Sequence, residues 1–130
     1  LDAPCASEAR FDANDPESWS HWNLKKVQES ARKQRRLLDS AIRSLRPGGT
    51  LVYCTCSFSP EENEQAVDSQ LRRYGDAVAV TPIELPLSNV QPGLLQWGRH
   101  SYNEQLRHAV RVLPNAEMRG FFLFRLIRHH

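Results

Sequence analysis

Two cysteine thiols follow segments of this chain that are expected to end β-strands. Cys56 comes shortly after residues 50–54, whose apolar, β-favouring side chains are typical of a strand buried in a parallel sheet. Cys5 comes directly after Pro4, and a proline forces a central strand to end by Ala3. Thiolates are nucleophiles, and open α/β sheets bind ligands at the carboxyl ends of their strands. We therefore expect one reaction site with two thiols, although a small buried filler is the alternative role for Cys56.

A long amphipathic helix is expected between the two cysteines. Asn23 can cap its start, and the sequence Pro47-Gly48-Gly49 stops it. Its apolar stripe, at spacings of three, four and seven, is Leu24, Val27, Ala31, Leu38, Ile42 and Leu45. Its basic face carries Lys25, Lys26, Arg32, Lys33, Arg35, Arg36 and Arg43. That face is either a solvated surface or a surface that contacts phosphates.

A second helix is expected soon after Cys56. Ser59 can cap it, Pro60 suits its first position, and Glu62 lies three residues after the cap. The helix would run over residues 60–74 and end at Gly75. Because a helix amino terminus stabilises a thiolate, this placement favours ionisation of Cys56.

The remaining segments complete an α/β pattern. Residues 77–80 and 120–127 are expected to be strands, and residues 83–118 an irregular connection with an extended piece near 109–113. Alternating strands and helices predict a mostly parallel sheet of at most four strands, into which the last strand inserts antiparallel. Residues 6–23 are expected to form a loop at the site, with one helical turn after Asp15. In that loop, Trp19 and Trp22 either pack the loop down or stack on a substrate.

The composition indicates one globular domain: 130 residues, 40% hydrophobic and 25% charged, with a net charge of only +2. No apolar run is long enough to cross a membrane, and no signal-peptide pattern is present. An odd number of cysteines, three, indicates free thiols in a reducing, intracellular compartment. Cys54 is expected to be buried and inert, and no metal is expected because no fourth ligand is suitably spaced.

The two cysteine segments taken together resemble a known protein family. They are Asp2-Ala3-Pro4-Cys5 and Thr55-Cys56-Ser57. The accompanying pieces are Gln34-x-x-Leu37-Leu38-x-x-Ala41, residues 47–53, Pro60-Glu61-Glu62-Asn63, Arg111-Val112-Leu113-Pro114 and Gly120-Phe121-Phe122. This set is similar to the Nop/Sun (Sun/Fmu) family of RNA cytosine-5 methyltransferases, and the similarity covers nearly the whole chain.

The resemblance implies an α/β, Rossmann-like fold that uses S-adenosylmethionine, with residues 1–130 forming the carboxyl-terminal portion of one catalytic domain. It implies that Cys56 is the nucleophile, that Cys5 assists product release, and that Asp2 lies beside both the cofactor and the target base. It also assigns Pro4 to substrate binding, and the substrate would be ribosomal or transfer RNA. Since the fold's glycine-rich cofactor loop is not found here, we expect the isolated chain to bind S-adenosylmethionine poorly or not at all. The location would be cytoplasmic in a bacterium, and nuclear, nucleolar or mitochondrial in a eukaryote.

The chemistry of cytosine explains these residue types. Carbon 5 is a poor nucleophile, and a thiolate that adds to carbon 6 turns the ring into an enamine-like species. The charge that develops on the ring needs a partner at ring nitrogen 3 and the exocyclic amine, and a suitably protonated carboxyl such as Asp2 can be that partner. A second thiol can assist departure of the first. The base must also leave its stack to be reached.

Two other functions are considered. A catalytically silent, methyltransferase-like module would bind RNA or a protein partner through the basic helix. A DNA cytosine-5 methyltransferase would use a Pro-Cys nucleophile without the second, Thr-Cys element.

Overall fold

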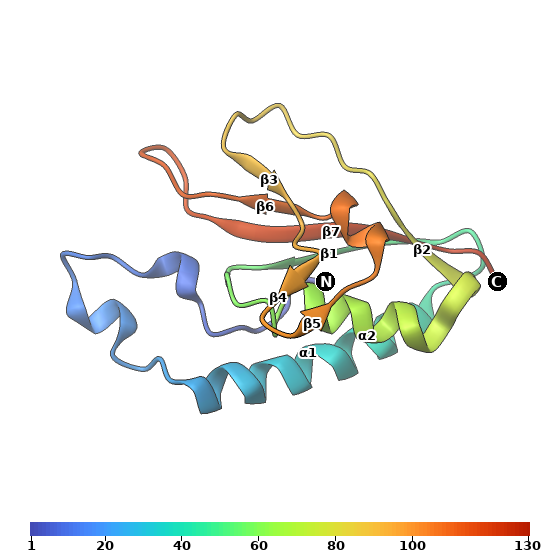
Figure 1. Cartoon of the computed structure of the whole chain (residues 1–130), viewed down its shortest axis with the longest axis horizontal. Coiled ribbons are helices and arrows are strands. Elements are labelled where there is room, and N and C mark those ends of the chain that lie inside the picture. The colour runs from blue at the N-terminus through green and yellow to red at the C-terminus, as the bar shows by residue number, and fades with distance from the viewer.

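The sheet is organised around its last strand. The computed structural model describes all residues from Leu1 to His130. Strand β7 (Phe121–Arg128) pairs with β1 (Thr50–Thr55) along one edge, and with β2 (Val78–Thr81) and β6 (Val110–Val112) along the other. Strand β3 (Val90–Pro92) extends the sheet from β6. Helices α1 (Leu24–Ser44) and α2 (Glu64–Tyr74) lie together along one face of this sheet (Figure 1).

The prediction of a mostly parallel sheet with at most four strands is wrong. The sheet has five strands, and each pairing between them is antiparallel. Strands β1 and β2 do run in the same direction, as a helical crossover requires, but β7 lies between them and is antiparallel to both. The antiparallel insertion of the last strand is therefore confirmed.

The first residues of the chain form the one parallel pairing. Asp2 bridges Cys54 in parallel orientation. The Cys54 N–H donates to the carbonyl of Leu1 and the Ala3 N–H donates to the carbonyl of Cys54, both at 2.9 Å. The segment that ends in Cys5 therefore lies directly beside β1, as the sequence predicted.

Helix α1 follows the predicted pattern with two differences. Asn23 caps it, accepting the Lys26 N–H at 2.8 Å. Most of the apolar stripe is buried, but Leu24 is 57% exposed because it lies at the first turn, beyond the sheet core. Gln34 is fully buried instead, although a polar residue interrupts the stripe there.

Helix α2 starts at Glu64, so the prediction of a start at Pro60 is wrong. The Ser59 hydroxyl donates to the Glu62 carboxylate at 2.6 Å and caps no helix N–H. Residues 60–63 form turns in which Pro60 accepts the N–H groups of Asn63 and Gln65. The helix ends at Gly75, whose φ of 52° is readily reached by glycine.

The predicted irregular connection contains short elements that lack a readable period. They are β3, the hairpin of β4 (Gln96–Trp97) and β5 (His100–Ser101), the 3-10 turn Glu104–His108, and β6. The predicted extended piece is β6. Two further 3-10 turns, Glu8–Arg10 and Pro16–Trp19, lie in the loop before α1. The second is the helical turn predicted after Asp15, and the Asp15 side chain caps it. None of the helices has the length and apolarity needed to cross a membrane.

The core lies between the sheet and the two helices. Tyr53, Phe122 and Phe124 are fully buried, with the Tyr53 and Phe124 rings 5.2 Å apart. Leu38 and Ile42 of α1 close the same core. Burial of side chains of this size stabilises a fold by roughly 1.5–3 kcal/mol each. The core thus holds β1 and its carboxyl end in place.

Candidate active site at the carboxyl end of strand β1

The two predicted cysteines meet at the end of β1. The Sγ atoms of Cys5 and Cys56 are 3.0 Å apart, both side chains are half-buried, and both thiols are free. The Ser7 hydroxyl lies 3.6 Å from the Cys56 sulfur and 3.9 Å from the Cys5 sulfur. Ser7 has a φ of 61°, and no other residue apart from glycines has a positive φ. Backbone strain of this kind is concentrated at functional sites.

The environment keeps the Cys5 thiol protonated. Burial raises the pKa of Cys5 to about 12, and its hydrogen bond with Cys56 acts in the same direction. Burial also raises the pKa of Cys54, and the nearby Asp2 carboxylate adds to that increase. At neutral pH Cys5 is therefore a neutral thiol in contact with the sulfur of Cys56.

A cavity of about 340 Å³ opens beside Cys56. Its wall consists of Asp2, Arg10, Cys54, Thr55, Cys56, Arg119, Gly120 and Phe121. The volume is within the range of small-molecule sites. Gly120 is required there, because a Cβ atom at this position would collide with the Phe58 ring.

The other two predicted site residues lie differently. Asp2 is exposed, lines the cavity and makes no side-chain hydrogen bond. Pro4 does not line the cavity, and its carbonyl accepts the Gln34 amide at 2.7 Å. The structure thus brings Asp2 and Cys56 to one cavity and Cys5 to Cys56. A contact between Pro4 and substrate stays a prediction.

Arg10 and Arg119 were not identified from the sequence. Both are exposed, both line the cavity, and neither side chain forms an ion pair or hydrogen bond. They place positive charge at the mouth of the cavity. Neither residue belongs to a pattern that the sequence offered, because exposed loop residues carry no period.

Glu62 joins the two cysteine loops, a role that the sequence did not reveal. It is fully buried, and its Oε1 accepts the Ala6 N–H at 2.7 Å and the Gln34 amide at 3.4 Å. Its Oε2 accepts hydrogen bonds from the Ser57 and Ser59 hydroxyls. No cation pairs with this carboxylate, so these donors alone compensate its burial. Residues directly after Cys5 and directly after Cys56 are thereby fixed to one side chain.

A buried ion pair supports the loop from the other side. The Arg111 guanidinium donates to both oxygens of Glu64, at 2.5 and 2.6 Å, and to the Phe58 carbonyl at 2.9 Å. This bidentate arrangement ties β6 to the first residue of α2 and to the loop that follows Cys56.

The tryptophans of the first loop are partly exposed, and their predicted roles, packing of the loop or stacking on a substrate, stay predictions. Trp19 is 38% exposed and Trp22 is 41% exposed. The loop is held by other contacts, since the Ser18 hydroxyl donates to the Asp15 carbonyl at 2.7 Å. Two indole rings are therefore available for stacking.

Curated proteins match this chain over nearly its whole length. A family model described as 16S rRNA methyltransferase RsmB/F matches residues 1–127. Ribosomal RNA small subunit methyltransferase F of Serratia proteamaculans is 39% identical over 130 residues, which are 100% of this chain and 25% of that protein. The tRNA (cytosine(49)-C(5))-methyltransferase of Pyrococcus abyssi is 35% identical over 127 residues, which are 97% of this chain and 40% of that protein. The chain therefore spans a quarter to two fifths of the length of these relatives.

Solved structures show the same fold. A methyltransferase homolog from Pyrococcus horikoshii has a TM-score of 0.78 and 30% identity, and the match covers 100% of this chain and 38% of that one. NSun6 from Pyrococcus horikoshii with SFG has a TM-score of 0.69 and 30% identity, covering 100% of this chain and 29% of that one. These matches confirm an α/β methyltransferase-like fold and the resemblance drawn from the two cysteine motifs. The chain belongs to the 16S rRNA methyltransferase RsmB/F family.

Proposed function

We propose that residues 1–130 are the carboxyl-terminal portion of the catalytic domain of an RNA (cytosine-5)-methyltransferase. The enzyme would transfer a methyl group from S-adenosylmethionine to carbon 5 of a cytosine in ribosomal or transfer RNA. The observation that carries this proposal is the 3.0 Å contact of the Cys5 and Cys56 thiols next to a cavity at the end of β1. The two relatives, named as ribosomal RNA and tRNA methyltransferases, support the same reaction and substrate class.

Cys56 is proposed as the nucleophile. Its sulfur forms a bond to carbon 6 of the flipped cytosine, and the electron pair of the 5,6 double bond moves to carbon 5. That carbon then takes the methyl group of S-adenosylmethionine as the methyl–sulfur bond breaks, and the electron pair of that bond stays on the sulfur of the departing thioether. Afterwards the proton leaves carbon 5 to a water molecule that acts as base, the 5,6 double bond re-forms, and the Cys56 sulfur departs with the electron pair of the carbon–sulfur bond.

Cys5 is proposed to assist the last step. With its pKa raised to about 12 by burial, Cys5 holds a proton at neutral pH. It lies close enough to donate a hydrogen bond to the departing sulfur of Cys56. A variant without this thiol would keep the covalent adduct longer.

We propose that Asp2 contacts both the target base and the cofactor. Its carboxylate is exposed at the cavity and has no partner within the chain, so it can accept donors from a bound molecule. S-adenosylmethionine supplies an electrophilic methyl group when bound. A single carboxylate offers few contacts to such a molecule, so calorimetry on the isolated 130 residues should show weak binding or none.

The contact between the Cys5 and Cys56 thiols also indicates the compartment in which the enzyme acts. Two free thiols in contact form a disulfide readily in an oxidising compartment. We therefore propose an intracellular site of action for this enzyme.

Substitution of each thiol in the full-length enzyme tests the function. Cys56→Ala should abolish transfer of labelled methyl groups to RNA. Cys5→Ala should instead accumulate a protein–RNA adduct that survives denaturing electrophoresis. The comparison variant Cys54→Ala removes the third thiol, which lines the cavity but has no proposed role in the reaction, so it should accumulate no adduct and should transfer methyl groups faster than Cys56→Ala. The Cys5→Ala/Cys56→Ala double variant should form no adduct. Methyl transfer by Cys56→Ala at the wild-type rate would overturn the assignment.

The silent-module alternative predicts a different result. Full-length wild-type protein would then bind RNA and transfer no methyl group, and all three cysteine variants would bind RNA equally well.

A further inference from the structure

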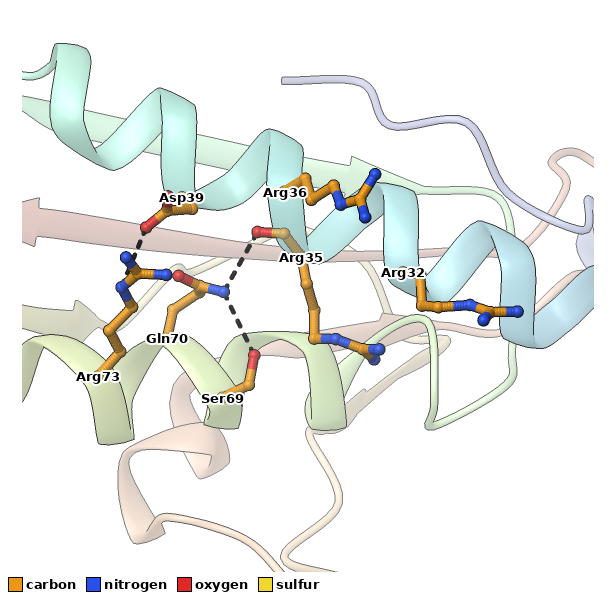
Figure 2. Close-up of a pocket in the computed structure, with 7 residues that line it drawn as sticks. All are labelled: Arg32, Arg35, Arg36, Asp39, Ser69, Gln70 and Arg73. Carbon is orange, nitrogen blue, oxygen red and sulfur yellow. Dashed lines mark hydrogen bonds and ion pairs between the residues drawn. The ribbon is translucent and has the colours of Figure 1, made fainter.

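A basic groove lies between α1 and α2, outside the cavity of the two cysteines. It has a volume of about 350 Å³, and no hydrophobic residue lines it. Arg32, Arg35 and Arg36 line it from α1 and Arg73 lines it from α2 (Figure 2). We name these four residues the arginine groove.

Most of the charge in the arginine groove is uncompensated. Arg32, Arg35 and Arg36 form no ion pair and donate no side-chain hydrogen bond within the chain. The one carboxylate in the groove, Asp39, is shared by Arg73 at 3.3 Å and Arg43 at 3.0 Å. Four guanidinium groups therefore face a single carboxylate that is already engaged. A polyanion would complete the pairing.

The arginines are presented by a rigid framework. Gln70 is 4% exposed and forms the floor, where its amide nitrogen donates to the Arg35 carbonyl at 3.2 Å and to Ser69 at 3.3 Å. Its Oε1 is buried without a donor. Tyr74 donates to Asp39 at 2.6 Å and further joins the two helices. Little conformational entropy of the backbone is therefore lost when a ligand binds.

The groove continues toward the two cysteines. A second hollow of about 350 Å³ shares Arg32 and Arg35 with it and reaches Glu61, in the loop that follows Cys56. Helix α1 begins at the same end of the molecule as the loop of residues 5–23 (Figure 1). Arg32 and Arg36 are one helical turn apart, so their charges follow one line along α1.

We propose that the arginine groove binds the phosphate backbone of the RNA strand whose target base enters the cavity beside Cys56. Guanidinium groups suit phosphates because they donate in a planar, bidentate fork. The absence of an apolar side chain in the groove favours a nucleic-acid backbone over a protein partner, whose interface would need an apolar centre. That the polyanion is RNA rests on the proposed function.

The test compares two triple variants of the full-length enzyme that lose the same charge. Arg32→Gln/Arg35→Gln/Arg36→Gln removes the groove charges that have no partner. Arg46→Gln/Arg99→Gln/Arg107→Gln removes three exposed arginines outside the groove whose side chains form no hydrogen bond or ion pair. Binding of substrate RNA is measured by filter retention across a salt series without cofactor, and methyl transfer is measured separately.

The groove variant should bind RNA at least tenfold more weakly, and the slope of log K against log salt should fall by about 0.7 for each lost contact. Its KM for RNA should rise while kcat at saturating RNA stays within about twofold. The control variant should behave like the wild type. A third variant, Arg32→Lys/Arg35→Lys/Arg36→Lys, keeps the charge and should restore most of the binding even if the glutamine variant folds poorly.

Equal effects of the glutamine variants in both places would overturn the proposal, because they would reflect net charge alone. Unchanged RNA binding in the groove variant would overturn the proposal too. If that variant bound RNA normally but no longer bound an acidic protein, the groove would be a protein-binding site and the proposal would also be wrong. Wild-type protein that binds RNA through the groove but transfers no methyl group would instead contradict the proposed function.

Discussion

The Sγ atoms of Cys5 and Cys56 lie 3.0 Å apart, although the two cysteines are 51 positions apart in the chain. Two features produce this contact. The segment that ends in Cys5 pairs in parallel with β1, and Glu62 fixes the residue after each cysteine. Both thiols are free, and a disulfide would need a separation of about 2.05 Å. Small movements of two side chains would close that difference.

Mild oxidation of the full-length enzyme should therefore join Cys5 to Cys56 and stop methyl transfer. Diamide should produce a Cys5–Cys56 linked peptide in non-reducing mass spectrometry, and dithiothreitol should restore activity. The Cys5→Ala variant should form no such link. Preferential pairing of Cys54, or a link only between molecules, would contradict the geometry.

Alkylation of Cys5 should depend steeply on pH. A thiol is neutral when protonated, so burial that disfavours the thiolate raises its pKa from 9.0 to about 12. The thiolate fraction, and with it the reaction rate, should rise about tenfold per pH unit up to nearly pH 11. Peptide mapping after brief iodoacetamide treatment of the wild-type protein measures each cysteine separately. A plateau of the Cys5 rate near pH 9 would contradict the burial argument.

The helices and β1 could be predicted from the sequence because their signals are local. Apolar spacing and the Asn23 cap define α1, and Gly75 marks the end of α2. The position of β7 between β1 and β2 could not be predicted, since strand order depends on pairing between distant segments. Parallel neighbours were expected because strands and helices alternate along the chain.

The two cysteines of the candidate site could be predicted from the sequence, but the groups that hold their loops in place could not. Cys5 and Cys56 lie in two motifs, each next to a strand. Glu62 lies in a pattern typical of a helix cap, and its donors come from residues after both cysteines. Such a polar network exists only in three dimensions, so spacing along the chain assigned Glu62 to the wrong role.

Removal of the Glu62 carboxylate should loosen both cysteine loops. Glu62→Ala leaves the Ala6 N–H and the Ser57 and Ser59 hydroxyls without their acceptor, which should lower the free energy of unfolding by about 3 kcal/mol. Glu62→Gln keeps one acceptor oxygen and should lose less. Urea denaturation measures the stability and single-turnover methyl transfer measures the site.

The matched control for Glu62 is its neighbour Glu61. Its side chain makes no hydrogen bond or ion pair within the chain and is only half-buried. Glu61→Gln should change stability by no more than about 0.5 kcal/mol. Similar losses in the Glu61 and Glu62 variants would show that the network does not hold the loops.

The Glu64–Arg111 pair should give a strongly non-additive double-mutant cycle. Glu64 is fully buried and Arg111 is 8% exposed, so removal of either partner leaves a charge without compensation. Arg111→Met should lower the free energy of unfolding by about 3–5 kcal/mol, because the Glu64 carboxylate would stay buried alone. In the Glu64→Gln/Arg111→Met double variant no such charge remains, so much of the loss should be recovered. Urea denaturation of the four proteins gives the coupling energy, and additive losses would contradict a buried, mutually compensating pair.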